Sequence, residues 1–301
     1  MSAPARPRET LADALARGTA RLAGAGVETP ARDARRLLAH AAGIGADRLT
    51  LHLRDPLRPQ AARRYAAALA ARAAGRPVAR ITGARLFWGR PFAVTDAVLD
   101  PRPETETLVA AALEAPYSRV LDLGTGSGIL AVTLLAERPA ATGRATDIDA
   151  AALDVARANA AAHGVADRLE LCRADWAEGA LGPFDLIVSN PPYIPAADLP
   201  ALAPEVRDHD PPHALTDGAD GLTAYARIAR AAPALLAPGG RLIVEVGAGQ
   251  AGAVAALFSA AGLAVAPPRA DMDGRDRAVL ARLPQPRGRG RAAPNRAAGT
   301  T

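Results

Sequence analysis

The feature that most constrains the fold is an alternation of short apolar runs with helical stretches after residue 119. Parallel strands that are buried on both faces read as continuous apolar runs, because helical crossovers cover the sheet on both sides. The pattern therefore predicts an α/β fold with a seven-stranded, Rossmann-like sheet. The predicted strands cover residues 120–123, 144–146, 169–171, 186–188, 242–246, 264–266 and 278–283. The predicted helices cover residues 128–137, 150–162, 221–236 and 250–261.

The residues before this α/β region have a helical pattern. Ala, Leu and Arg dominate residues 10–75, and Leu11, Leu15 and Leu22 recur at helical spacing. Glycine pairs interrupt the pattern, as expected between short helices. We therefore expect residues 1–75 to form a small helical domain.

Three further boundaries follow from changes in composition. Residues 76–100 are rich in aromatic and β-branched residues and in glycine, which predicts a β-hairpin linker. Residues 101–283 then form the α/β domain. Residues 284–301 contain Pro, Gly and Arg with almost nothing to bury, so a disordered tail is expected there.

Charge is distributed unevenly along the chain. Residues 1–90 carry 17 Arg against 6 acidic residues, whereas residues 91–283 carry 15 Arg against 25 acidic residues. Codon usage in a GC-rich genome explains the absence of lysine, but it does not explain this split in sign. The basic N-terminal segment suggests an arm that steers an anionic partner.

Cysteine, histidine and hydropathy exclude several classes of protein. The single Cys172 cannot form an internal disulfide, and the five histidines show none of the spacings of a zinc site. No metal is therefore expected. The chain lacks an apolar leader, and arginines interrupt its longest apolar stretches. We expect a soluble, cytoplasmic protein without a membrane span.

A glycine-rich turn marks the first candidate site. Gly124, Thr125, Gly126, Ser127 and Gly128 follow a predicted strand and open a predicted helix, so their backbone can approach a ligand at the helix N-terminus. The spacing is G-x-G-x-G, which differs from the dinucleotide pattern G-x-G-x-x-G.

Two acidic positions beyond this turn support a nucleoside-type ligand. Asp147 lies 23 residues after Gly124 at the end of the next strand, where a carboxylate can bind a ribose diol. Asp149 is its rival for that role, and we expect Asp149 to cap the following helix instead. Asp175 and Trp176 follow the third strand and can bracket an adenine ring by hydrogen bonding and stacking. Packing in the core is the alternative role for Trp176.

The second candidate site is the loop Ser189-Asn-Pro-Pro-Tyr-Ile194, which follows the fourth strand. The Asn190 side-chain oxygen and the Pro191 carbonyl can accept both hydrogens of one NH2 group. Pro191 and Pro192 stiffen the backbone that presents these acceptors, and Tyr193 offers a flat face for a planar group. A turn that merely closes the strand, with Asn190 as its cap, is the structural alternative.

This arrangement suits methylation of a planar amide-type nitrogen. The lone pair of such a nitrogen is delocalised, so it attacks a sulfonium poorly. Two accepted hydrogen bonds increase its electron density and aim it at the methyl group. We therefore predict that Asn190, Pro191 and Tyr193 are catalytic and that they bind the substrate together with Pro192. S-adenosyl-L-methionine is the expected cofactor.

Together these motifs resemble the N5-glutamine methyltransferases of bacterial peptide-chain release factors, the PrmC/HemK family. The likeness covers residues 30–282, and its most specific part is the run Pro101-Arg-Pro-Glu-Thr-Glu106. The other matching segments are Arg76-Pro-Val78, Ile81-Thr-Gly83, Phe87-Trp-Gly89, Gly124 to Gly128, Ser189 to Ile194, Asp217-Gly218, Asp220-Gly-Leu222, Glu245-Val-Gly247, Gln250 and Gly274-Arg-Asp-Arg277.

The resemblance implies a class I methyltransferase domain whose substrate is the glutamine of a Gly-Gly-Gln loop in class-one release factors. It implies that the helical N-terminal domain helps to dock this protein. It also implies that Asn190 to Tyr193 receive the glutamine amide, and that S-adenosylmethionine contacts the residues Gly124, Thr125, Gly126, Ser127, Gly128, Asp147, Trp176 and Asn190. One departure is His209-Asp210-Pro211, where the family usually has an aromatic residue followed by Glu-Pro.

Two enzymatic alternatives share the same loop chemistry. A nucleic-acid adenine-N6 methyltransferase also presents an exocyclic NH2 group, which base flipping can bring into such a pocket. The chain shows no recognisable nucleic-acid module, so direct nucleic-acid binding is not the favoured interpretation. A glutamine methyltransferase acting on a ribosomal protein is the second alternative. A non-enzymatic RNA-binding module explains neither candidate site.

Overall fold

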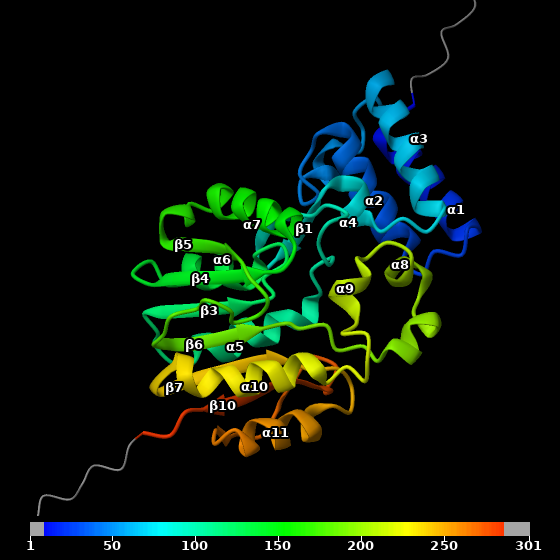
Figure 1. The fold of residues 1–301 in the computed structure, drawn as a ribbon. Coiled ribbons are helices and arrows are strands. Elements are labelled where there is room, and N and C mark those ends of the chain that lie inside the picture. The colour runs from blue at the N-terminus through cyan, green and yellow to red at the C-terminus, as the bar shows by residue number, and fades with distance from the viewer. Residues whose placement is uncertain (1–8, 286–301) are drawn as a thin grey trace, which may run out of the picture.

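The computed structural model describes residues 9–285, which form a helical N-terminal part and an α/β part (Figure 1). The predictions for residues 1–8 and 286–301, including most of the expected tail, lie outside the described residues. The α/β part is built on an eight-stranded sheet. Along its main path the strands are β5 (Leu169–Arg173), β4 (Thr142–Asp147), β3 (Arg119–Leu123), β6 (Phe184–Ser189), β7 (Leu236–Glu245), β10 (Asp276–Arg282) and β8 (Ala264–Val265).

All seven predicted strands are present, and the prediction of a Rossmann-like α/β sheet is confirmed. The strands from β5 to β7 are parallel, whereas β10 runs antiparallel to β7 and β8. The prediction missed β9 (Arg269–Ala270), which pairs with β10 off the main path. Two exposed residues carry no alternating pattern from which such a strand can be recognised.

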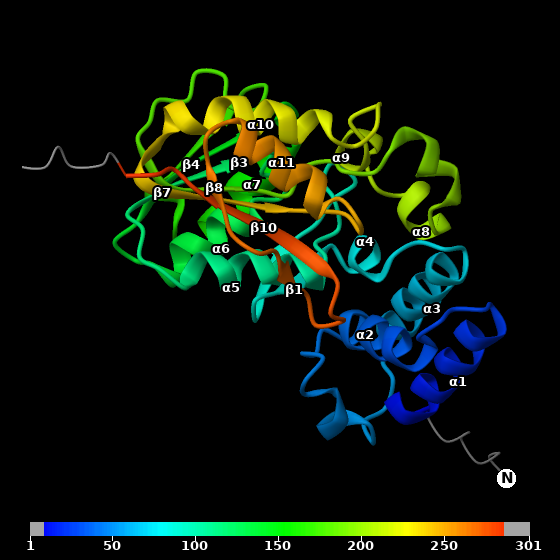
Figure 2. The same cartoon turned by 90° about the horizontal axis from the view of Figure 1, so that it is seen from below.

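Helices cover both faces of the sheet because neighbouring strand residues point to opposite sides (Figure 2). Val120 packs with Leu186 in one apolar cluster, whereas the next residue, Leu121, packs with Ile187 in the other. The first cluster includes residues of α5 (Glu106–Leu113), α6 (Ile129–Glu137) and α7 (Ala150–Ala162). The second includes residues of α10 (Thr223–Leu235) and α11 (Ala251–Ala260).

The N-terminal helices pack around their own apolar cluster. They are α1 (Leu11–Gly24), α2 (Pro30–Ala42), η1 (Leu49–His52), α3 (Pro59–Ala73) and α4 (Val78–Thr82). Thr10 and Asp13 form a reciprocal capping box that starts α1. Gly18 lets α1 approach α3, since a Cβ there would lie 1.9 Å from the hydroxyl oxygen of Tyr65.

The segment at residues 76–100 contains a hairpin and a helix. Strands β1 (Ala84–Phe87) and β2 (Arg90–Ala93) pair across the turn residues Trp88 and Gly89, both with positive φ, which suits a tight hairpin. The sequence predicted no helix here, yet α4 precedes β1. Its residues Val78 and Ile81 pack against the N-terminal apolar cluster, and this tertiary burial outweighs the β preference of these side chains.

A buried ion-pair cluster joins the two parts of the molecule. Asp210 is 4% exposed and accepts hydrogen bonds from Arg80 of α4 at 2.8 Å and from Arg102 at 2.6 Å. Arg80 also donates to the carbonyl oxygen of Val98. Asp210 lies in the segment between β6 and α10, which contains η4 (Ala196–Ala201), α8 (Pro204–Arg207) and α9 (Pro212–Leu215). The sequence run that departs from the family pattern thus anchors α4 to this segment.

Replacing Asp210 by Ala should lower the free energy of unfolding by about 3–5 kcal/mol, because it leaves the Arg80 guanidinium buried without its counter-charge. Urea denaturation measures the change. The matched control is Asp208→Ala, which breaks a solvent-exposed pair with Arg207 and should cost far less than Asp210→Ala. Equal losses in the two variants would show that the buried pair does not hold the parts together.

Candidate active site

The glycine loop lies between β3 and α6, at the carboxyl edge of the sheet. Gly124, Gly126 and Gly128 all have positive φ, a conformation that side chains other than glycine rarely adopt. At Gly128 a Cβ would also lie 3.1 Å from the Cβ of Ala156, so the loop passes directly over α7. The loop therefore presents its backbone, rather than side chains, at the N-terminus of α6.

Asp147 holds this loop in place from the end of β4. One of its carboxylate oxygens accepts a hydrogen bond from the Gly126 amide at 2.8 Å, and the other accepts one from the Asp149 amide at 2.9 Å. Asp149 in turn accepts from the Ala151 amide and caps α7, as the sequence predicted. Each Asp147 oxygen keeps a lone pair for a further donor.

Asn159 of α7 connects the loop to the hairpin. This buried side chain exchanges hydrogen bonds with the amide and carbonyl of Ala93 in β2. Its amide nitrogen also donates to the Ser127 carbonyl oxygen at 2.8 Å. One side chain thus fixes the distance between β2 and the glycine loop.

Asp122, near the end of β3, supports the glycine loop through hydrogen bonds. The carboxylate accepts hydrogen bonds from the Thr125 hydroxyl at 2.6 Å and the Ala131 amide at 3.2 Å. Its other oxygen is buried and has no hydrogen-bond partner among the described residues. Burial raises the pKa of Asp122 to about 7, against the effect of these two hydrogen bonds.

Most of the predicted cofactor residues line one cavity of about 320 Å³. Its wall includes Gly124, Thr125, Gly126, Ser127, Asp147, Trp176 and Asn190, and also Pro192, which the sequence predicted as a substrate-binding residue. Gly128 and Pro191 are not among its lining residues. Trp176 lines the cavity and also packs against the apolar cluster under α10 and α11, so both of its predicted roles are compatible with its position. The Asp175 carboxylate pairs with Arg227 of α10.

A second cavity, of about 270 Å³, adjoins the first. Tyr193, Glu104, Glu245 and Arg277 contribute to its wall. Both cavities share the lining residues Leu99, Arg102, Asn190 and Ala214. Asn190 therefore stands where the two spaces meet.

A chain of hydrogen bonds runs from Asn190 into the core. The Asn190 side-chain nitrogen donates to the Thr105 hydroxyl at 3.2 Å, and this hydroxyl donates to the Glu245 carboxylate at 2.6 Å. The Tyr193 hydroxyl lies 3.4 Å from the other Glu245 oxygen. Burial raises the pKa of Glu245 to about 7 and keeps the pKa of Tyr193 far above its usual range.

The sequence interpretation assigned no role to Thr105 or Glu245. Thr105 lies in the run Pro101 to Glu106, which the sequence identified only as a signature. Glu245 ends the apolar strand β7, and a carboxylate at the end of a buried parallel strand is the signal that could have pointed to it.

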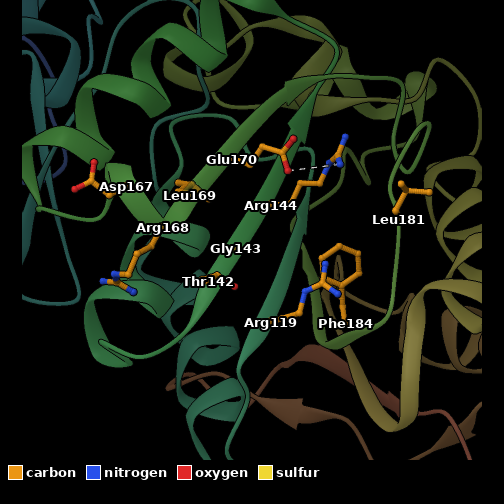
Figure 3. A pocket seen from close by; sticks show the side chains of 10 residues that line it. All are labelled: Arg119, Thr142, Gly143, Arg144, Asp167, Arg168, Leu169, Glu170, Leu181 and Phe184. Atoms are coloured by element: carbon orange, nitrogen blue, oxygen red, sulfur yellow. Dashed lines mark ion pairs between the residues drawn. The ribbon is translucent and has the colours of Figure 1, made fainter.

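A cavity of about 430 Å³ at the opposite edge of the sheet contains none of the predicted site residues (Figure 3). Arg119 lies over the Phe184 ring, with the guanidinium carbon 4.9 Å from the ring centre, and donates to the Pro183 carbonyl. Arg144 pairs with Glu170 at 3.6 Å. The arginines of this cavity are thus engaged by the protein itself.

Residues 9–285 contain neither a membrane-spanning helix nor a cluster of metal ligands. No helix there is long and apolar enough to cross a membrane. The same residues contain no group of three or more His, Cys, Asp or Glu side chains that could hold a metal ion.

Replacing Asp122 by Asn should change how stability depends on pH. The folded chain keeps Asp122 protonated up to about pH 7, whereas the unfolded chain ionises it near the ordinary aspartate pKa of 3.8. Its contribution to stability is therefore complete below pH 3.8 and is lost as the pH rises to about 7. Urea denaturation should favour wild type over Asp122→Asn by about 1–3 kcal/mol more at pH 5 than at pH 8. Parallel pH curves would contradict a protonated Asp122.

Comparisons with known proteins agree with this geometry. The family described as the PrmC N-terminal domain matches residues 13–83, and the methyltransferase small domain matches residues 99–202. A release factor glutamine methyltransferase of Cereibacter sphaeroides is 63% identical over 91% of this chain and 98% of its own length. Its counterpart from Rhodospirillum rubrum is 48% identical over 89% of this chain and 83% of its own length.

A solved methyltransferase from Pyrococcus furiosus shares the fold, with a TM-score of 0.52 at 16% identity over 65% of this chain and 90% of that one. The sequence relatives are far closer than this structure, and they extend over both the helical and the α/β parts. The chain belongs to the family of release factor glutamine methyltransferases.

Proposed function

We propose that this enzyme transfers a methyl group from S-adenosylmethionine to the side-chain amide nitrogen of the glutamine in the Gly-Gly-Gln loop of class-one release factors. The observation that carries the proposal is the position of Asn190 in the wall of both cavities. A residue there can contact the methyl donor on one side and the methyl acceptor on the other. The 63% identity to a release factor glutamine methyltransferase supports this substrate.

The cavity of about 320 Å³ fits the methyl donor. The free lone pairs of Asp147 can accept hydrogen bonds from the two ribose hydroxyls, and the indole of Trp176 can stack on the adenine. The absence of side chains at Gly124 and Gly126 allows close backbone contact. S-adenosylmethionine, when bound, supplies an electrophilic methyl group on a sulfonium.

The second cavity then receives the glutamine side chain. The Asn190 oxygen and the Pro191 carbonyl accept its two amide hydrogens, which raises electron density on nitrogen and holds its lone pair toward the first cavity. Pro191 is not among the lining residues of either cavity, so the role proposed for its carbonyl rests on its place next to Asn190 in the chain. The nitrogen–carbon bond forms as the methyl–sulfur bond of the sulfonium breaks and leaves a neutral thioether, and the nitrogen then gives one of these two hydrogens to water as a proton.

Tyr193 closes the acceptor side and is held firmly. Its carbonyl oxygen accepts a hydrogen bond from Gln250 at 2.8 Å. Gly221 approaches so closely that a Cβ there would lie 2.2 Å from the same oxygen. The ring itself lies close to Gly247, where a Cβ would lie 3.0 Å from its Cδ2 atom. A ring held in this way can orient a planar amide at little entropic cost on binding.

The N-terminal helices complete the proposal as the docking site for the release factor, in the cytoplasm. Their match to the PrmC N-terminal domain supports a protein substrate over a nucleic acid. Neither a metal nor direct contact with nucleic acid is part of this proposal. A ribosomal-protein glutamine and a flipped adenine remain the competing acceptors, because both offer the same planar NH2 group.

Purified enzyme with S-adenosylmethionine should add one methyl group to a class-one release factor. Peptide mass spectrometry should locate that group on the loop glutamine. The control substrate carries asparagine in place of this glutamine and should stay unmodified, because its shorter side chain does not reach Asn190. Methylation of the asparagine variant elsewhere, or of naked DNA instead, would overturn the proposal.

Asn190→Ala should reduce turnover of the release factor by at least about a hundredfold, because it removes one of the two amide acceptors. Binding of S-adenosylmethionine, measured by calorimetry, should change by less than about tenfold. Single-turnover rates separate the two effects. Unchanged turnover would remove Asn190 from the mechanism.

A further inference from the structure

We infer that Thr105 and Glu245 are positioning residues that determine which end of the Asn190 side-chain amide faces the acceptor. The inference deepens the proposed function and rests on it for its catalytic consequence. An asparagine amide can turn about its last bond and then offers hydrogens where it previously offered an oxygen. Only the oxygen-outward arrangement can accept a hydrogen from a substrate NH2 group.

The geometry selects this arrangement through one buried hydroxyl. Thr105 is fully buried, and its hydroxyl has a single hydrogen to donate. An ionised carboxylate only accepts, so that hydrogen goes to Glu245, 2.6 Å away. The Thr105 oxygen is then left to accept, and it receives the Asn190 side-chain nitrogen at 3.2 Å. The Asn190 oxygen is consequently the end that remains for a substrate.

The charge on Glu245 therefore controls the direction of the whole chain of hydrogen bonds. A protonated Glu245 can donate to Thr105, which frees the Thr105 hydrogen for the Asn190 oxygen. The amide would then turn its NH2 group toward the acceptor, where it opposes the hydrogens of the substrate. Methyl transfer should fall as Glu245 takes up its proton.

Groups on several elements set that protonation. The pKa of Glu245 is raised to about 7, chiefly by burial and in smaller part by the charge of Glu104. The Thr105 and Tyr193 hydroxyls and the Arg277 guanidinium of β10 lower it. From α10, the Tyr225 hydroxyl donates to the backbone carbonyl of Glu245 and leaves the carboxylate to the other groups.

Thr105→Val tests the hydroxyl without changing the shape of the side chain. We expect kcat on the release factor to fall at least about tenfold, with KM and cofactor binding changed less than about threefold. Thr105→Ser restores the hydroxyl and should recover most of kcat. The matched control is Thr133→Val in α6. Thr133 is equally buried, and its hydroxyl has no partner among residues 9–285, so activity should be retained.

Glu245→Gln tests the charge through the pH profile. Wild-type kcat should decline as the pH falls through about 7, which is the pKa of Glu245. Glutamine has no carboxyl to protonate, so the variant should lack this decline even if its kcat is lower throughout. Persistence of the same acid decline in the variant would assign it to another group and contradict the inference.

A readout independent of the substrate separates this inference from the proposed function. The chain contains three asparagines, Asn159, Asn190 and Asn295, so nitrogen-15 labelling of asparagine gives few side-chain NH2 signals. The Asn190 signal, identified by its loss in Asn190→Ser, should shift and exchange its hydrogens faster in Thr105→Val but not in Thr133→Val. It should also titrate near pH 7 in wild type and not in Glu245→Gln.

The combined outcomes are decisive. If the Asn190 signal responds as expected but no release factor is methylated, the proposed function fails and the amide orientation stands. If release factors are methylated while Thr105→Val leaves both the signal and kcat unchanged, the positioning role fails and the function stands.

Discussion

The common direction of strands β3, β4, β6 and β7 is the constraint on which the site depends. Parallel strands end at the same edge of a sheet, so the loops that follow them must converge there. The glycine loop, Asp147, Asn190 and Glu245 each come directly after or at the end of one of these strands. Residues 121 positions apart, from Gly124 to Glu245, thus meet without any long connection of their own.

The convergence of these loops does not by itself form the second cavity. Its walls also depend on the buried carboxylate of Asp210. Asp210 brings together α4, the run that precedes α5 and the segment between β6 and α10. Arg102, one of its partners, also lines both cavities. A buried ion pair therefore sets the position of a residue in the wall of both cavities.

The sequence predicted the parts of the site that depend on local order along the chain. Asp147 and Asn190 were recognised because each follows an apolar strand, and Asp149 because a helix follows it. Thr105 and Glu245 are 140 positions apart, and only the folded sheet brings them within hydrogen-bond distance. Helix α4 was missed for a related reason, since burial against distant helices decides its conformation. The second cavity likewise depends on irregular residues between β6 and α10, which carry no periodic signal.

The three hydrogen bonds of Asn159 limit how modular this architecture is. The first family match ends at residue 83 and the second begins at residue 99, which suggests that the N-terminal helices could be exchanged between relatives. Because Asn159 joins Ala93 to Ser127, however, the hairpin belongs with the glycine loop. A chimaera should keep β1 and β2 with the α/β part, and the incoming helices must supply an arginine in the place of Arg80.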